Sequence, residues 1–509
     1  MCLVASLIVL TLVIFATDAA DSATGGAPRR FPMTAPAWER DHAVTHVVPT
    51  TTGKLTGATY VHKETGTRSV VFLGVPFAQP PVGSLRWRPP VQLPADAAEH
   101  DIDATAFAPS CVQLPSTAVP AHVQSEDCLY INLYLPEAAL LAADHSAAQR
   151  PVLEYIYGGS FVSGSSANQD INGLNLTLTD AVVVTMNYRL GPFGFLATRA
   201  SMAQEVTTGN YGLLDQAAAM EWVAANVAAF GGDPAGITLF GESAGAISVC
   251  FHLVWHKHRE SSLFARAIMQ SPDSPAQLAC FRELSAQTVL HALPLQAFGE
   301  TTGASYGGVI DGMIVTGKPN EVLARDGVEP DVPVVAGTCA QSCTLFVMPN
   351  ATQRNMSNNT LVARLSALWP PAAVTQILDA YPLSAYQLVP PASAWAHMLS
   401  DYVFHCPTRT TASLLAAGSA RTHLYVYDHP PHCDHYPRDL HKYMGAYHYA
   451  DVPATFGSPP LHPPEPCAWS AADAAVSATI QQLWHNFALG KPMATAWPAY
   501  DTSSRPLAR

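Results

Sequence analysis

The sequence contains few charged residues and even fewer basic ones. Only 13% of its 509 residues are Asp, Glu, Lys or Arg, whereas 49% are hydrophobic. This composition excludes an intrinsically disordered chain, which combines low hydrophobicity with high net charge. The 26 Lys and Arg residues stand against 39 Asp and Glu residues, for a formal net charge of −13. The chain therefore lacks the basic excess that binding to nucleic-acid phosphates requires, and we expect no nucleic-acid partner.

The N-terminal apolar run at 3–15 is not preceded by any Lys or Arg, so only the terminal amine supplies the positive charge usual in a signal peptide. In other respects the run fits a signal peptide. Mostly small residues follow it at 16–20, and it is too short to span a membrane comfortably. We expect a signal peptide at 1–20 and a polar linker at 21–45, with a retained membrane anchor as the alternative. The chain should then be secreted, with no stable membrane span after cleavage.

Sequons for N-glycosylation fit a secreted chain, although Asn-x-Ser/Thr also arises often by chance. Three of the four lie in one polar stretch at 350–360, which we expect to be an exposed loop. The sequence predicts a glycoprotein with four candidate acceptors: Asn175, Asn350, Asn355 and Asn358.

Ten cysteines occur, and without Cys2 of the leader nine remain, an odd number for an oxidising compartment. Cys111 and Cys128 flank a short loop that contains proline. A disulfide between them would stabilise the chain by about 3 kcal/mol. The sequence alone does not pair the others: Cys250, Cys280, Cys339, Cys343, Cys406, Cys433 and Cys467.

Two groups of residues invite a metal interpretation. The spacing of Cys339 and Cys343 would suit a metal site only with a second cluster, which the sequence lacks. Five histidines between His429 and His448 are scattered among prolines rather than set at helical spacing. We therefore expect no metal.

Short runs rich in Val, Ile and Tyr, bounded by turn residues, predict buried strands. Alternation at 50–67, around Gly53 and Gly57, predicts an antiparallel hairpin, and an extended segment follows at 70–75. Apolar residues at helical spacing predict two helices, at 212–230 and 246–254. This alternation of strands and helices predicts an α/β fold with a mostly parallel sheet. The predicted buried strands are 129–135, 152–157, 181–186 and 237–240.

The segment Gly241-Glu242-Ser243-Ala244-Gly245 lies between a predicted strand and a predicted helix. Gly-x-Ser-x-Gly in this context is the nucleophile elbow, in which the glycines allow a tight turn that exposes the serine hydroxyl. The motif alone is weak evidence, but its context makes it specific. We predict Ser243 as a nucleophile.

A nucleophilic serine needs donors for the oxyanion and a general base. Gly158, Gly159 and Ser160 follow the strand 152–157, where hydrolases of this kind offer backbone N–H groups, and the N–H of Ala244 is another candidate. A plain strand-ending turn is the alternative, and Tyr157 either braces this turn or packs in the core. His448 lies C-terminal to Ser243, as the chain order of such triads requires.

These segments resemble the type-B carboxylesterase family, which includes the carboxylesterases and cholinesterases and has the α/β-hydrolase fold. The resemblance covers about 50–500 and also rests on three signature-like segments, at 72–86, 125–132 and 230–245. It implies one domain over 46–509, with a central, mostly parallel twisted sheet flanked by helices and a small N-terminal antiparallel hairpin.

The resemblance also implies an activity and a set of roles. The chain would hydrolyse a small carboxylic ester through an acyl-enzyme on Ser243, with His448 as general base and no cofactor or metal. The oxyanion hole would be formed by the N–H groups of Gly159, Ser160 and Ala244. By the same resemblance, the disulfide and two ion pairs belong to the scaffold: Cys111–Cys128, Arg86–Glu126 and Arg189–Asp215.

The acid of the catalytic triad is missing from its expected position, where this chain has Ser342. No Asp or Glu occurs between Asp331 and Asp379, so a small error of alignment cannot supply one. A hydroxyl can orient the imidazole but cannot stabilise the imidazolium, and in serine proteases loss of the acid costs about 10⁴ in turnover. We expect a slow Ser-His-Ser esterase. Two alternatives stay open: a carboxylate borrowed from Glu242 or Asp451, or a catalytically silent binding module like the adhesion-type relatives.

Other departures from the family concern substrate scope and length. Ser160 replaces a glycine and adds a side chain where acyl groups pass. No Trp, Tyr or Phe lies between Cys111 and Cys128, the loop in which cholinesterases hold quaternary ammonium by a cation–π contact. We therefore expect a general or lipid-like ester rather than a choline ester. The resemblance also implies an omitted helical segment near 271–280, which leaves Cys280 unpaired, and omitted C-terminal helices.

Overall fold

The computed structural model describes residues 30–116, 119–141, 149–197, 207–255, 263–272, 307–327, 332–418, 421–433, 435–459, 468–493 and 497–501. The expected signal peptide, residues 21–29 of the expected linker, the segment at 273–306, Cys280 and Cys467 lie outside these ranges. Among the described residues, no helix is both long and apolar enough to cross a membrane.

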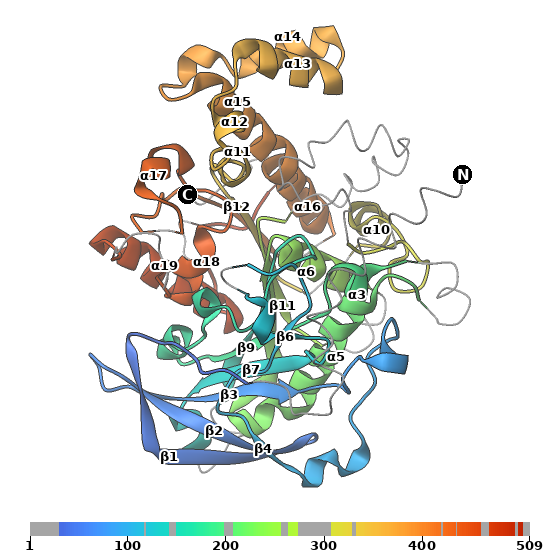
Figure 1. Cartoon of the computed structure of the whole chain (residues 1–509), viewed down its shortest axis with the longest axis vertical. Coiled ribbons are helices and arrows are strands. Elements are labelled where there is room, and N and C mark those ends of the chain that lie inside the picture. The colour runs from blue at the N-terminus through green and yellow to red at the C-terminus, as the bar shows by residue number, and fades with distance from the viewer. Residues whose placement is uncertain are drawn as a thin grey trace.

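An 11-stranded sheet forms the centre of the described chain (Figure 1). Its path runs β1-β2-β3-β7-β9-β8-β10-β11-β12-β13, and β4 pairs with β2. A separate two-stranded sheet joins β5 (Ser110–Cys111) and β6 (Gln124–Ser125). The strands of the large sheet are β1 (Trp38–Thr50), β2 (Gly53–His62), β3 (Arg68–Pro76), β4 (Asp101–Asp103), β7 (Tyr130–Pro136), β8 (Arg150–Ile156), β9 (Val182–Met186), β10 (Gly232–Glu242), β11 (Arg266–Gln270), β12 (Val334–Cys339) and β13 (Thr422–Tyr427).

The pairing changes from antiparallel to parallel along the sheet. The β1–β2, β2–β3, β3–β7 and β7–β9 pairs are antiparallel, whereas β9, β8, β10, β11, β12 and β13 are parallel neighbours. The short strand β4 pairs parallel with β2. Every residue of β9 and β12 is buried, as expected for strands covered on both faces. The predicted α/β class, with a mostly parallel sheet and an N-terminal antiparallel hairpin, is confirmed.

The first strand begins earlier than predicted. β1 starts at Trp38, so the linker boundary at 45 is wrong, and Gly57 lies inside β2 rather than in a turn. The reason is that β1 is an edge strand. It pairs through its backbone, with a register shift between Asp41 and Thr45. Because its exposed polar side chains give no clear hydrophobic alternation, the residue pattern does not predict this strand.

Helices cover both sides of the central strands. Figure 1 shows α5 (Tyr211–Asn226) and α6 (Ala244–Val254) on one side, and α18 (Asp451–Phe456) and α19 (Ala471–Ala488) on the other. The predicted helices at 212–230 and 246–254 are confirmed, with the last turn of the first one a 3₁₀ helix, η7 (Val227–Phe230). The remaining helices include α2 (Ala138–Leu141), α3 (Gly191–Phe195), α10 (Pro319–Asp326), α17 (Arg438–Met444) and the shorter 3₁₀ turns.

A group of helices between β12 and β13 projects from the sheet (Figure 1, yellow to orange). The prediction of an exposed loop at 350–360 is wrong, because most of this segment forms helices. Asn350 caps one by accepting from the N–H of Gln353, and Ser357 caps the next by accepting from the N–H of Thr360. The group comprises α11 (Thr344–Val347), α12 (Ala351–Arg354), α13 (Asn358–Leu368), α14 (Pro371–Ala380), α15 (Pro390–Leu399), the π-helix η10 (Ser400–His405) and α16 (Cys406–Ala417).

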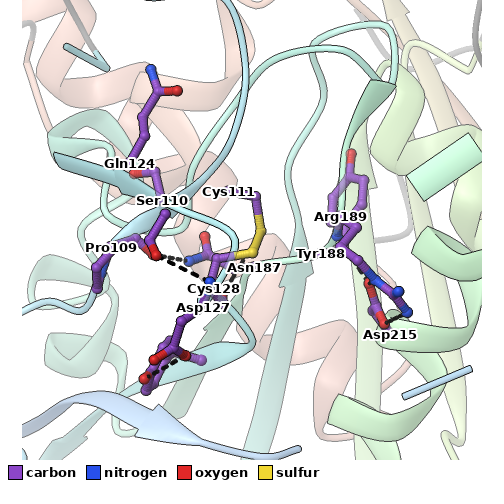
Figure 2. Close-up of a disulfide and its surroundings, with 12 residues drawn as sticks. Pro109, Ser110, Cys111, Gln124, Asp127, Cys128, Asn187, Tyr188, Arg189 and Asp215 are labelled. Atoms are coloured by element: carbon purple, nitrogen blue, oxygen red, sulfur yellow. Dashed lines mark hydrogen bonds and ion pairs between the residues drawn. A yellow bond between two sulfur atoms is a disulfide. The ribbon is translucent and has the colours of Figure 1, made fainter. Parts of the chain in front are cut away.

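The disulfide between Cys111 and Cys128 is present, with Cα atoms 5.0 Å apart (Figure 2). Cys433 is also disulfide-bonded, while Cys250, Cys339 and Cys406 are thiols.

Both expected ion pairs form. Arg86 binds Glu126 at 2.5 and 2.6 Å, and Arg189 binds Asp215 at 2.7 and 2.8 Å in the interior.

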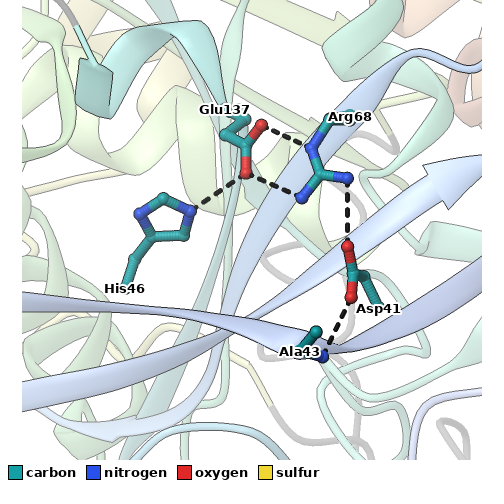
Figure 3. A network of polar contacts seen from close by, with 5 residues as sticks. All are labelled: Asp41, Ala43, His46, Arg68 and Glu137. Atoms are coloured by element: carbon teal, nitrogen blue, oxygen red, sulfur yellow. Dashed lines mark hydrogen bonds and ion pairs between the residues drawn. The ribbon is translucent and has the colours of Figure 1, made fainter.

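A four-residue network ties the edge strand β1 to its neighbours (Figure 3). The guanidinium of Arg68 binds Glu137 at 2.6 and 3.2 Å and Asp41 at 3.0 Å, and His46 lies 3.1 Å from Glu137. Although burial acts to raise the pKa of Glu137, the bonds from Arg68 and His46 hold it below its ordinary value. Because the network lies near the surface, we expect each pair to contribute about 1 kcal/mol or less.

Candidate active site

Ser243 occupies a strained turn between β10 and α6. Its φ of 55° and ψ of −122° are unusual for a residue other than glycine. The turn is fixed by the N–H of Ser243, which donates to the carbonyl of Gln270 at 2.9 Å. A Cβ on Gly245 would lie 2.0 Å from the carbonyl oxygen of Ile156, so only glycine fits there. This geometry is that of a nucleophile elbow, and it leaves Ser243 partly exposed.

The loop after β8, at 158–161, lies against Ser243, and we call it the oxyanion loop. A Cβ on Gly158 would come within 2.9 Å of the Cβ of Ser243, which shows how closely the backbone approaches. Gly159 has a φ of 104°, and the side chain of Ser160 is exposed. Within the described residues, no backbone carbonyl accepts from the N–H groups of Gly159, Ser160 or Ala244. These N–H groups are therefore available to a ligand.

His448 lies in the loop between α17 and α18, with its ring packed between aromatic side chains. The ring centres of Phe404 and Phe346 are 4.5 and 5.5 Å from that of His448. Burial lowers the pKa of His448 to about 3, so the imidazole is neutral at physiological pH. A neutral imidazole can accept a proton, as a general base must.

Ser342 lies beside His448, but its hydroxyl does not face the imidazole. The N–H of His448 donates to the carbonyl of Ser342 at 3.1 Å, whereas the Ser342 hydroxyl donates to the carbonyl of Cys339 at 2.8 Å. Among the described residues, Nδ1 of His448 has no hydrogen-bond partner. The expected hydrogen bond from a hydroxyl at the acid position to the imidazole is thus not present.

The segment 339–343, here called the acid loop, is also held from the π-helix. Nε2 of His405 lies 3.0 Å from the carbonyl of Cys339, and Nδ1 of His405 lies 2.8 Å from Asp401. Ser400 accepts from the N–H of Cys343 at 2.9 Å. The π-helix therefore positions both the acid loop and Phe404, which packs on His448.

The two carboxyl groups considered as substitutes for the acid behave differently. Oε1 of Glu242 lies 3.0 Å from Nε2 of His448, without the alignment of a hydrogen bond. Burial, and secondarily the charge of Asp451, raise the pKa of Glu242 well above its ordinary value, which favours the protonated carboxyl over the carboxylate. Asp451 instead accepts from Gln270 and Tyr425, at 3.0 and 2.9 Å. Neither group places a carboxylate on Nδ1 of His448.

The asparagines of the four sequons differ in how accessible their side-chain amides are to glycosylation. Asn175 uses both ends of its amide, because it accepts from Trp38 at 2.7 Å and donates to the carbonyl of Gly457 at 2.6 Å. Asn350 is engaged as a helix cap, whereas Asn355 and Asn358 are exposed.

Sequence reasoning missed the π-helix as part of the site. Phe404 and His405 lie more than 40 residues before His448, in a segment without a recognisable catalytic motif, and only the fold brings them together. In the described part of the chain, no three His, Cys, Asp or Glu side chains are grouped as a metal site.

Comparison with known proteins gives a consistent result. A family model described as "Carboxylesterase family" matches residues 44–279 and 272–509. The para-nitrobenzyl esterase of Bacillus subtilis is 32% identical, over 91% of this chain and 94% of its own length. Liver carboxylesterase B-1 of Rattus norvegicus is 30% identical, over 89% of this chain and 88% of its own. Acetylcholinesterase of Bungarus fasciatus is 28% identical, over 86% and 78% respectively.

Proposed function

The chain belongs to the carboxylesterase family, and from the esterases among its relatives we propose that it is a slow hydrolase of small carboxylic esters acting through Ser243. The single observation that supports this most is the strained elbow, which presents the Ser243 hydroxyl beside the available N–H groups of the oxyanion loop. Backbone strain of this kind persists where function requires it.

In the proposed mechanism, Nε2 of His448 takes the proton of Ser243 as the hydroxyl attacks the ester carbonyl. The N–H groups of Gly159, Ser160 and Ala244 stabilise the oxyanion, and His448 then gives the proton to the leaving alcohol. A water molecule then attacks the acyl-enzyme in place of Ser243, with the same proton transfers through His448, and the carboxylic acid product is released. Every proton passes through His448, and the chain needs no other chemical group.

The reaction is proposed to be slow because no negative charge balances the imidazolium. Nδ1 of His448 has no partner among the described residues, and burial raises the pKa of the neighbouring Glu242, which disfavours its carboxylate form. The same observation favours the second candidate, a catalytically silent binding member of the family. We propose neutral carboxylic esters as substrates, because the loop between Cys111 and Cys128 has no aromatic side chain for a quaternary ammonium.

Replacement of Ser243 separates the two candidates. We expect Ser243→Ala to reduce the hydrolysis of p-nitrophenyl butyrate to the rate in buffer, because the attacking oxygen is lost. Ser384→Ala, at an exposed position in the projecting helices, is the matched control and should keep the parent rate. Equal rates for the parent and Ser243→Ala would leave only the binding module.

We also propose that the chain is secreted and carries glycans at Asn355 and Asn358. Mass spectrometry of protein secreted from a eukaryotic host should find both asparagines modified and Asn175 unmodified, because the Asn175 amide is engaged on both sides. Asn358→Gln should remove one glycan. Asn359→Gln, an adjacent exposed change at the middle position of the same sequon, keeps Asn358-x-Thr360 intact and should remove none. A glycan on Asn175, or none on the exposed pair, would contradict this proposal.

A further inference from the structure

Tyr157 and Tyr188 form a reciprocal contact directly before the oxyanion loop. The hydroxyl of Tyr188 donates to the carbonyl of Tyr157 at 2.9 Å, and the hydroxyl of Tyr157 donates to the carbonyl of Tyr188 at 3.3 Å. The two rings are stacked, with centres 4.6 Å apart, and both side chains are buried. Tyr157 follows β8 and Tyr188 follows β9, so the contact joins the carboxyl ends of two neighbouring parallel strands.

Tyr188 is itself held in place by the residues on either side. Asn187 donates to the carbonyl of Pro109 at 3.0 Å and accepts from the N–H of Ser166 at 2.9 Å. On the other side, Arg189 forms the buried ion pair with Asp215 on α5 (Figure 2). The contacts of Asn187 and Arg189 therefore fix the backbone on both sides of Tyr188, and with it the position of the Tyr188 hydroxyl.

The oxyanion loop needs such a support. Gly159, Ser160 and Phe161 have consecutive φ values of 104°, 56° and 61°. Left-handed backbone at the two residues other than glycine costs on the order of 1 kcal/mol each, so surrounding contacts must hold it. The loop is tied at its far end by the N–H of Gly191, which donates to the carbonyl of Phe161 at 2.7 Å. At its N-terminal end, the loop is held by the hydrogen bond that the Tyr188 hydroxyl donates to the carbonyl of Tyr157.

We propose that Tyr188 is a positioning residue, which holds the oxyanion loop against Ser243 through the carbonyl of Tyr157. The inference rests on the proposed esterase function. The carbonyl of Tyr157 lies close to α6, because a Cβ on Gly245 would be 3.0 Å from its carbon. A shift of this peptide moves the N–H groups of Gly159 and Ser160 relative to the nucleophile.

Kinetics of tyrosine-to-phenylalanine variants test the proposal. Loss of a whole oxyanion donor costs about 10² to 10³ in kcat, so we expect misplacement in Tyr188→Phe to lower kcat about tenfold, with KM nearly unchanged. Tyr157→Phe loses only the longer bonds, at 3.3 Å to the carbonyl and at 3.5 Å from the N–H of Tyr188, so its kcat should fall less. Tyr130→Phe is the control, because it removes a similar bond, to Asp127 at 2.8 Å, away from the site. An unchanged kcat in Tyr188→Phe, or an equal fall in Tyr130→Phe, would overturn the proposal.

Hydrogen exchange gives a readout that does not depend on turnover. Amides of the peptide 158–163 should exchange faster in Tyr188→Phe than in the parent, and Tyr130→Phe should leave them unchanged. If the parent has no Ser243-dependent activity, the esterase proposal fails, and exchange alone decides the role of Tyr188. If Tyr188→Phe does not fold, Tyr157→Phe is compared with Tyr130→Phe in the same way. Unchanged exchange at the loop rejects the positioning role.

Discussion

Ser342→Glu is expected to raise kcat for p-nitrophenyl esters by at least about 10²-fold, because in serine proteases loss of the acid costs about 10⁴. We expect the longer side chain of a glutamate at position 342 to reach Nδ1 of His448, which has no partner among the described residues. It would stabilise the imidazolium that forms when Ser243 loses its proton. The measurement is kcat of the purified parent and variant under the same conditions.

The pH dependence of the same variant should change in a defined direction. Burial lowers the pKa of His448 to about 3 in the parent, so kcat/KM should not fall as pH drops through 6. A neighbouring carboxylate favours the imidazolium and raises this pKa. The variant should therefore lose activity at a higher pH than the parent as the base becomes protonated, and its advantage should be greater at pH 8 than at pH 5.

Ser342→Gln is the matched control for size, because it adds the same bulk without the charge. Position 342 is completely buried, so circular dichroism and thermal unfolding must show that both variants fold. If folded Ser342→Glu and Ser342→Gln have the same kcat, the proposal that the missing charge limits the rate is contradicted.

Glu154→Val is expected to stabilise the protein, by about 3 kcal/mol or more at pH 7. Glu154 is completely buried in β8, both of its carboxyl oxygens are unpartnered in the described chain, and burial raises its pKa to about 8. The unfolded chain ionises this group from about pH 4.5 upward, whereas the folded chain keeps the proton until about pH 8. The free energy of unfolding therefore falls by about 1.4 kcal/mol for each pH unit as the pH rises between these two values. Valine has a similar volume and does not titrate.

Thermal unfolding at pH 5 and pH 8 measures this effect. The Tm of Glu154→Val should exceed that of the parent by several degrees at pH 8, and by less at pH 5. Glu154→Gln removes the titration but keeps an unpartnered polar group, so its gain should be confined to the higher pH. A Tm difference for Glu154→Gln that is the same at both pH values would show that Glu154 does not titrate as described.

The central strands could be predicted because burial on both faces demands unbroken apolar runs. The predicted strands at 129–135, 152–157 and 181–186 agree with β7, β8 and β9 to within two residues. The edge strand β1 and the helices at 350–360 could not be predicted in this way. Their stability depends on backbone pairing and on caps rather than on a hydrophobic pattern.

The strained turn at Ser243 and the oxyanion loop beside it could be predicted because each is formed by residues adjacent in sequence. The partners of His448 depend on contacts between distant segments. The Ser342 hydroxyl could turn either to the imidazole or to the carbonyl of Cys339, and only the path of the acid loop decides. In the same way, Tyr157 and Tyr188 are 31 residues apart and meet because β8 and β9 are neighbours.

The carbonyl of Cys339 receives two contacts, from the Ser342 hydroxyl at 2.8 Å and from His405 at 3.0 Å. A carbonyl oxygen has two lone pairs, so it stays satisfied by His405 when the side chain at 342 changes. Position 342 can therefore exchange a hydroxyl for a carboxyl without leaving a buried acceptor unpaired. Under the proposed mechanism, one substitution at position 342 would complete the triad while the surrounding loop keeps its shape.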